Sequence, residues 1–281
     1  PRAAEVLVVV DNNDELLAQA TAELPEALVV PNDQVPGLSG ARMTGAHHAT
    51  GTILAFLDDD AAAEPQWLAE MAAAYADEHV LGTGGSVVPN WRTERPRWMP
   101  HELDWVVGCS WAGTPRERAR IRNPIGANMA MRADVLERAG GFAGELGRLE
   151  RGGKAVSGTA DETELAIRST ELFPGGYWLF CPEARVHHVV TAERTTWSYF
   201  VRRCRLEGSA KAILRGLTGP QSGLASERAY ATSVLPRAVL RELGAALRGD
   251  VWGLARAGAI VAGLSLTTFA YLSGRVAAAR A

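Results

Sequence analysis

The sequence is poor in cysteine and has no large excess of charge of either sign. Its three cysteines, Cys109, Cys181 and Cys204, are widely spaced and odd in number, which argues against a disulfide framework or a zinc site. We expect them to be buried, reduced thiols. The net charge of -3 gives no electrostatic reason to expect a nucleic-acid partner.

The N-terminus lacks a basic segment followed by an apolar run, so no secretory signal is visible and a cytoplasmic protein is expected. It also lacks an initiator Met and enters a predicted strand almost at once, and we therefore expect an upstream segment to be missing. The 281 residues, 47% of them apolar, are enough to form one large α/β domain or two small ones.

Apolar runs without alternation predict strands that are buried on both faces at 5–10 and 52–57, with a short strand at 27–30. Helices are predicted between them, at 15–24 and 41–50. Strands and helices that alternate in this order predict an α/β fold with a doubly wound, mostly parallel sheet.

The composition changes near residue 197, where helices rich in Arg and Ala begin. We predict an α/β domain over 1–196 and a helical region over 197–281. Within that region, 251–274 is apolar apart from Arg256, and its uninterrupted part is at the short end of the roughly 17–25 residues that span a bilayer. A buried or interfacial helix is favoured over a span, which allows peripheral contact with the inner face of the cell membrane.

Three carboxylates, Asp58, Asp59 and Asp60, follow the predicted strand at 52–57 directly. Ligands of open α/β sheets bind beyond the carboxyl ends of strands, and adjacent acids repel one another unless a cation or hydrogen-bond donors compensate them. Alternate residues of an extended segment face the same way, so Asp58 and Asp60 are expected to share Mg²⁺ or Mn²⁺. The alternative is that the three acids cap the helix that follows.

An ordered series of segments resembles the family-2 glycosyltransferases, which are inverting, metal-dependent enzymes of the GT-A fold. The segments are VVVDN at 8–12, GLSGAR at 37–42, FLDDD at 56–60, NPIGANMAMR at 123–132 with GGF at 140–142, and DETEL at 161–165. The resemblance implies transfer of a hexose from a nucleotide-sugar donor to a glycan, lipid or small-molecule acceptor, as in the synthesis of cell-envelope glycans.

The same resemblance implies roles for individual residues that bind the metal and the donor. The metal ligands would be Asp58, Asp60 and His188, because a neutral imidazole can complete the metal shell. The donor would contact Asp11, Asp59, Arg202 and Arg203, the two guanidinium groups lying at its diphosphate. Arg194 offers a further guanidinium group that could bind the diphosphate. The alternatives are a strand-end turn role for Asp11, a structural His188 and solvated arginines.

The catalytic base would come from the acidic pair at 161–162. Family members usually carry Glu and then Asp there, whereas this chain carries Asp161 and then Glu162. A Glu side chain is one methylene longer and can still abstract a proton, so Glu162 is the expected base and Asp161 the alternative. Thr159 and Glu162 also have the spacing of a capping box, which would give Glu162 a structural role as well.

Two other functions fit part of this pattern. A nucleotidyltransferase also uses paired carboxylates and a metal, but it would be expected to carry a basic Gly-rich loop near the first strand, and this sequence has none there. A catalytically impaired sugar-nucleotide-binding or scaffold protein would explain the reversed acidic pair. It would also explain why the sequence does not include the family's first strand and helix, whose loop helps to hold the nucleobase.

Overall fold

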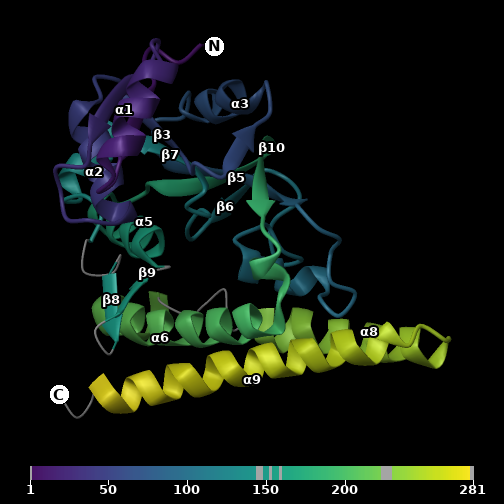
Figure 1. Ribbon diagram of the computed structural model, residues 1–281. Coiled ribbons are helices and arrows are strands. Elements are labelled where there is room, and N and C mark those ends of the chain that lie inside the picture. The colour runs from purple at the N-terminus through teal and green to yellow at the C-terminus, as the bar shows by residue number, and fades with distance from the viewer. Residues whose placement is uncertain (1, 144–147, 152–153, 158–159, 223–229, 279–281) are drawn as a thin grey trace. The chain divides into compact units, whose positions relative to one another are not determined.

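The computed structural model describes residues 2–143, 148–151, 154–157, 160–222 and 230–278. They form a mixed α/β protein with a helical C-terminal region (Figure 1), so the expected fold class is confirmed. The chain divides into two compact units. The first unit comprises Pro1–Leu57, Pro65–Gly85 and Arg118–Ala184, and the second comprises Asp58–Glu64, Ser86–Glu117 and Arg185–Ala281. The predicted boundary at residue 196 stays a prediction.

The first unit begins with a parallel pair of strands. Strands β1 (Leu7–Val10) and β2 (Leu28–Pro31) are joined by helix α1 (Asp14–Glu23), the connection that parallel strands require. The side chain of Asn13 caps α1 by accepting a hydrogen bond from the amide of Leu16. Helix α2 (Leu38–His48) follows, and the Glu5 carboxylate accepts hydrogen bonds from the amides of Thr50 and Gly51 just beyond its end.

The larger sheet in the first unit is antiparallel where its register is defined. Strand β7 (Asn128–Arg132) pairs with β3 (Ile53–Leu57) on one side and with β5 (Val80–Trp91) on the other, and β6 (Ala119–Ile121) pairs with β10 (Tyr177–Val190). We expected a mostly parallel sheet, but among the pairs with a defined register only β1 and β2 are parallel. An apolar run predicts a strand but not its direction, which depends on the connections before it.

The core of the first unit lies between this sheet and the helices α2, α4 (Ala133–Arg138) and α5 (Asp161–Leu172). Helix α3 (Trp67–Ala74) buries Trp67, Met71 and Ala74. The largest fully buried side chain of the core is Trp178, whose ring lies against Gly82. A Cβ atom at Gly82 would lie 2.4 Å from that ring, so only glycine fits there. The Trp178 indole donates a hydrogen bond of 3.1 Å to the hydroxyl of Ser169 on α5. A short hairpin, β8 (Arg148–Arg151) and β9 (Lys154–Ser157), precedes α5.

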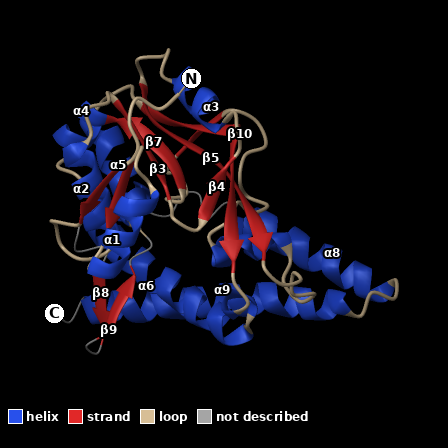
Figure 2. Cartoon of the chain, turned by 45° about the horizontal axis from the view of Figure 1, so that its top comes forward, coloured by secondary structure: helices blue, strands red, loops and turns tan. Residues whose placement is uncertain are grey.

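The second unit is dominated by three helices, α6 (Trp197–Ser222), α8 (Leu235–Leu247) and α9 (Trp252–Ala278). Helix α9 packs along both α6 and α8, as Figures 1 and 2 show. Glycine allows the close approach, because a Cβ atom at Gly208 of α6 would lie 2.2 Å from the carbonyl oxygen of Thr267. The unit also contains β4 (Ala61–Ala63) and the short helices η1 (His101–Val107), η2 (Glu193–Thr195) and η3 (Tyr230–Val234).

Candidate active-site clusters

A cluster of three metal-ligand side chains lies in the second unit. One ligand atom from each of Asp58, Asp60 and His188 lies within 4.8 Å of the other two, and the Asp60 Oδ1 atom is 3.1 Å from His188 Nε2. Two carboxylates and an imidazole are suitable ligands for a divalent cation such as Mn²⁺. The structure therefore brings together the three residues that the sequence predicts as metal ligands.

A turn, and not an extended segment, brings the two aspartates together. The amide of Ala61 donates to the carbonyl of Asp58 (3.0 Å), and the amide of Val189 donates to the carbonyl of Asp60 (2.8 Å). Strand β4 then pairs antiparallel with the end of β10, with Ala61 opposite His188. Asp58 and Asp60 are close together as predicted. The reason given for it, that alternate residues of an extended segment face the same way, was wrong. Asp59, in the middle of the turn, is exposed and lies outside the cluster.

Arg194 on η2 contacts the same cluster. Its Nη2 atom donates to Asp60 Oδ2 at 3.0 Å, and its Nη1 atom lies 3.3 Å from His188 Nε2. The hydrogen bond from His188, together with the charge of Arg194, holds the pKa of Asp60 below its usual value even though the side chain is half-buried. A cation bound by these atoms would share them with the guanidinium group, so Arg194 opposes cation binding as it is placed here.

His188 itself is buried beside a thiol. Its Nδ1 atom lies 3.9 Å from Cys109 Sγ, and burial raises the pKa of Cys109 to about 12, so this sulfur remains a neutral thiol at neutral pH. Gly108 takes a left-handed conformation (φ 79°) directly below the imidazole, and a Cβ atom there would lie 3.4 Å from the ring. These contacts fix the ring so that Nε2 faces Asp60.

The acidic pair Asp161 and Glu162 begins helix α5 in the first unit. Asp161 is buried with only 2% of its surface exposed. It accepts a hydrogen bond of 2.8 Å from the Ser39 hydroxyl and lies 3.6 Å from Arg42 Nη1. The N-cap residue is Ala160, which makes no side-chain hydrogen bond, and Thr159, which the alternative capping box needs, lies outside the described residues.

The pKa values of the two carboxyl groups of the pair are shifted in opposite directions. Burial opposes ionisation of Asp161, but hydrogen bonds from Glu162 and Ser39 and the charge of Arg42 hold its pKa below the usual value. Loss of hydration and the neighbouring Asp161 carboxylate raise the pKa of Glu162 well above its usual range. The pair therefore titrates as a coupled unit, and Glu162 holds the last proton more tightly than Asp161 does.

Arg42 joins three of the sequence segments that carry the family resemblance. From helix α2 its Nη2 atom donates to the carbonyl of Gly126 (3.0 Å), and its guanidinium lies 5.7 Å from the centre of the Phe142 ring. A Cβ atom at Gly126 would lie 2.9 Å from that Nη2 atom. Ser39 and Arg42 were not predicted from the sequence as partners of Asp161. The burial of Arg42, which calls for a buried acid as its partner, is known only from the structure.

Comparison with known proteins assigns the family. The family model described as glycosyl transferase family 2 matches residues 2–140. A glucosyl-dolichyl phosphate glucuronosyltransferase of Haloferax volcanii is 32% identical over 214 residues, which are 75% of this chain and 67% of that protein. The chain belongs to glycosyltransferase family 2. Another relative is the succinoglycan biosynthesis protein ExoM of Rhizobium meliloti, with 27% identity over 72% of this chain and 62% of its own length.

A solved structure supports the fold of this glycosyltransferase. The mannosyltransferase PcManGT from Pyrobaculum calidifontis, solved in complex with GDP-Man and Mn²⁺, matches with a TM-score of 0.52 and 22% identity. The match covers 94% of this chain and 77% of that one, so it includes the C-terminal helices. The GT-A fold that the sequence predicts is therefore confirmed.

Asp11 ends strand β1 of the glycosyltransferase and organises the loop before α2. Its Oδ1 atom accepts a hydrogen bond of 2.6 Å from the Asn32 side chain, and its Oδ2 atom accepts one of 2.8 Å from the amide of Gly37. The next residue, Asn12, has a positive φ of 54°, which belongs to a tight turn. Asp11 is exposed, so the turn role is observed and the predicted contact with a nucleoside stays a prediction.

The two predicted diphosphate ligands on α6 lie in different surroundings. Arg202 is exposed and donates to Glu193 at 2.9 Å, the residue that precedes Arg194 on η2. Arg203 is largely buried, and its Nη2 atom lies 3.9 Å from Glu207 Oε2. Its Nη1 atom is buried with no hydrogen-bond partner among the described residues. Neighbouring residues of a helix point in different directions, and their shared role at the donor stays a prediction.

Proposed function

We propose that this glycosyltransferase is metal-dependent and inverting, and that it transfers a hexose from a nucleotide-diphosphate sugar to a glycan, lipid or small-molecule acceptor. The observation that carries the proposal is the cluster of Asp58, Asp60 and His188 within 4.8 Å in a chain of this family. A divalent cation held there would neutralise the charge that develops on the departing nucleoside diphosphate. Mg²⁺ and Mn²⁺ both accept this set of ligands.

The acidic pair supplies the base in this proposal. Glu162 in its ionised form takes the proton of the acceptor hydroxyl as that oxygen bonds to the sugar carbon and the bond to the diphosphate breaks. A raised pKa makes Glu162 the stronger base of the pair once it is ionised. Asp161 is the positioning residue, because Ser39 and Arg42 already engage its carboxylate.

A lipid-linked acceptor is favoured among the three acceptor classes. The name of the Haloferax volcanii relative states transfer of a glucuronosyl group to glucosyl-dolichyl phosphate, which is a sugar on a lipid phosphate. That support extends to the class of acceptor and not to the sugar. Asp11, Asp59, Arg202 and Arg203 remain the proposed contacts of the nucleotide part of the donor.

The test is release of nucleoside diphosphate from a panel of nucleotide-sugars by the purified full chain, with and without Mn²⁺ or Mg²⁺. Hydrolysis that needs the cation and that Asp58→Ala abolishes is the expected result. Asp59→Ala is the matched control for the cation, since Asp59 is adjacent but lies outside the cluster. It should keep the Mn²⁺ affinity of the unmodified chain in the absence of donor.

The scaffold alternative gives a different result in the same assay. A catalytically impaired protein would bind one of the nucleotide-sugars, measured by calorimetry, and would release no nucleoside diphosphate with any acceptor or cation. Transfer that continues at full rate after removal of all divalent cations with a chelator would contradict the metal role of Asp58, Asp60 and His188 instead. The two failures are therefore distinguishable.

A further inference from the structure

We propose that the outer face of helix α9 docks on the surface of a membrane that contains anionic lipids. We define this outer face by five exposed apolar side chains, which are Leu254, Val261, Leu264, Phe269 and Leu272. Between 40% and 72% of the surface of each is exposed. The helix is the one segment among the described residues that is long and apolar enough to cross a membrane.

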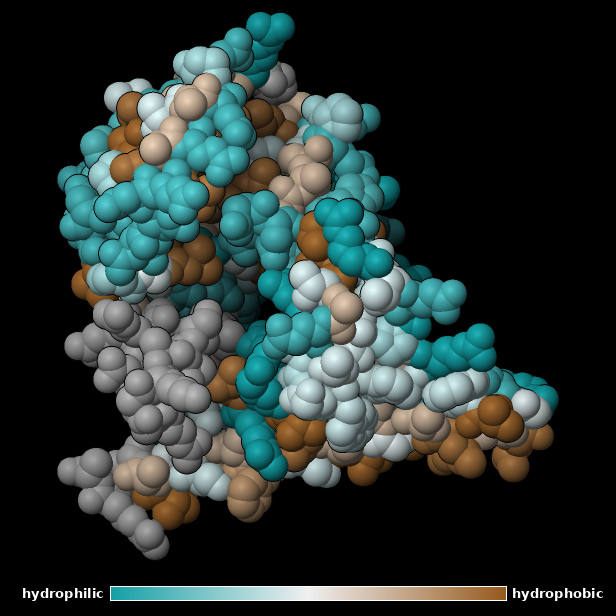
Figure 3. Space-filling model, viewed as in Figure 1, coloured by the Kyte–Doolittle hydropathy of each residue, from teal (hydrophilic) through white to brown (hydrophobic). Residues whose placement is uncertain are grey.

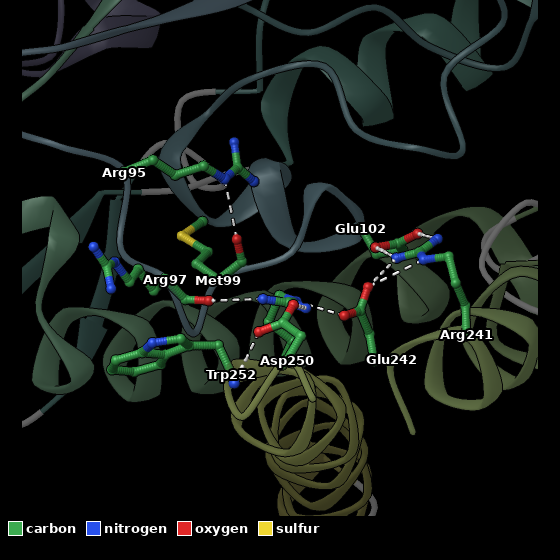
Figure 4. A network of polar contacts seen from close by, with 9 residues as sticks. Arg95, Arg97, Met99, Glu102, Arg241, Glu242, Asp250 and Trp252 are labelled. Atoms are coloured by element: carbon green, nitrogen blue, oxygen red, sulfur yellow. Dashed lines mark hydrogen bonds and ion pairs between the residues drawn. The ribbon is translucent and has the colours of Figure 1, made fainter. Parts of the chain in front are cut away.

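The outer face of α9 carries no charge over most of its length. The sequence has no Asp, Glu, Lys or Arg between 257 and 274. Arg256, at the start of the helix, is ion-paired with Glu242 and Asp250. Figure 4 shows these two acids within a wider network of polar contacts. A helix face that is exposed to water normally carries charged and polar side chains. A long, apolar and uncharged face of this kind marks an interaction surface.

The apolar surface continues onto the end of α8. Leu240 and Leu247 of α8 and Val251 in the following turn are exposed over 70%, 90% and 74% of their surface. Brown, hydrophobic side chains accordingly gather over the ends of α8 and α9 that meet at this turn (Figure 3). Leucines exposed to this degree stabilise the protein little in water, whereas burial in an apolar medium stabilises them.

The charge of the helical region indicates which partner covers this surface. Residues 197–281 contain 12 Lys and Arg but 4 Asp and Glu, a net charge of +8, which leaves -11 for residues 1–196 of the total of -3. Arg248 and Arg275 are exposed near the two ends of α9. Two copies of this positively charged region would repel one another, whereas an anionic lipid surface attracts it.

Packing on one side of α9 favours a helix that lies in the interface over one that spans the bilayer. Its other side buries Ala257, Ile260 and Ala270, and Gly263 packs against the Phe200 ring of α6. Two protein helices, α6 and α8, therefore occupy positions that lipid would occupy around a spanning helix. A helix with one apolar face and protein on the other lies in the plane of the membrane surface.

Vesicle flotation of the purified full chain tests the proposal, which does not depend on the proposed glycosyl transfer. The chain should float with vesicles of phosphatidylcholine mixed with phosphatidylglycerol, and less with phosphatidylcholine alone. High salt should weaken the binding, because it screens the attraction between exposed charges. The double variant Val261→Asp with Phe269→Asp should bind at least about tenfold more weakly, since two apolar groups lose their burial.

A matched control separates the outer face from apolar exposure in general. Leu172, at the end of α5 in the first unit, is 49% exposed, and Leu172→Asp should bind vesicles as the unmodified chain does. Circular dichroism should show both variants folded, since the changed side chains are exposed. The proposal would be overturned if Leu172→Asp lost as much vesicle binding as the double variant, or if the unmodified chain did not float. It would also be overturned if light scattering showed that the unmodified chain is a dimer and the double variant a monomer.

Discussion

The two carboxylate clusters use the same side-chain chemistry in opposite surroundings. In the first unit Asp161 is buried and Glu162 is half-buried, and the raised pKa of Glu162 reflects lost hydration and a like charge beside it. Asp60, in the second unit, is half-buried beside His188 and Arg194, and its pKa is lowered. The comparison teaches that neighbouring groups decide whether a carboxyl group favours its protonated or its ionised form.

Removal of a proposed metal ligand should have the largest effect. Asp60→Ala takes away a carboxylate that contacts His188 and Arg194. We expect cation-dependent transfer to fall by about 10⁴-fold, because a metal ion supplies several kcal/mol of transition-state stabilisation and ~1.4 kcal/mol is tenfold in rate. Calorimetric titration with Mn²⁺ should show the binding isotherm lost as well. Unchanged Mn²⁺ affinity would mean that the cation is held elsewhere.

Replacement of the proposed base should slow glycosyl transfer and leave cation binding intact. Glu162→Gln keeps the size of the side chain and removes its ability to accept the proton. We expect kcat to fall by about 10²–10⁴-fold, the range of general acid–base catalysis, with the Mn²⁺ affinity unchanged. If Glu162→Gln kept full transfer and Asp161→Asn lost it, the assignment of base and positioning residue would be reversed.

The pH profile should report the coupled titration of the acidic pair. Because the pKa of Glu162 is raised, kcat/KM should rise with pH and level off well above the usual pKa of a glutamate. Asp161→Asn removes the neighbouring charge, so the acidic limb of the residual activity should move to lower pH. If the acidic limb of the unmodified chain lay at the ordinary pKa of a glutamate, the proposed coupling of Asp161 and Glu162 would be contradicted.

The smallest effect is expected at Arg194. Arg194→Gln removes a positive charge that lies 3.0 Å from Asp60, so Mn²⁺ should bind more tightly, by about fivefold, since a unit charge at ~4 Å in water contributes ~1 kcal/mol. Arg202→Gln is the control, because Arg202 pairs with Glu193 and not with the cluster. Weaker Mn²⁺ binding by Arg194→Gln would show that the guanidinium supports the site.

The sequence allowed prediction of the residues at each cluster but not of the geometry that joins them. Asp58, Asp60 and His188 were found from an ordered series of segments. The turn at 58–61 and the pairing of β4 with β10 were not predicted, because a three-residue strand of alanines has no hydrophobic pattern to read. The antiparallel direction of β7 was missed for a related reason, since strand direction depends on long-range connections.

The supporting contacts were the least predictable part. Ser39 and Arg42 stand 122 and 119 positions before Asp161 in the sequence, and only the folded chain places them beside its carboxylate. The helical C-terminal region was predicted as such from composition, because a long apolar segment with a single arginine is readable without tertiary information. Its uncharged outer face became visible once the packed side of α9 was known.

The two units alternate along the chain, which passes between them five times through six segments. Strands β5 and β10 each begin in the first unit and end in the second. A recombination event at any single point between 58 and 184 would therefore take parts of both units from each parent. A single crossover after residue 190 would exchange the three C-terminal helices and leave both acidic clusters and His188 with one parent.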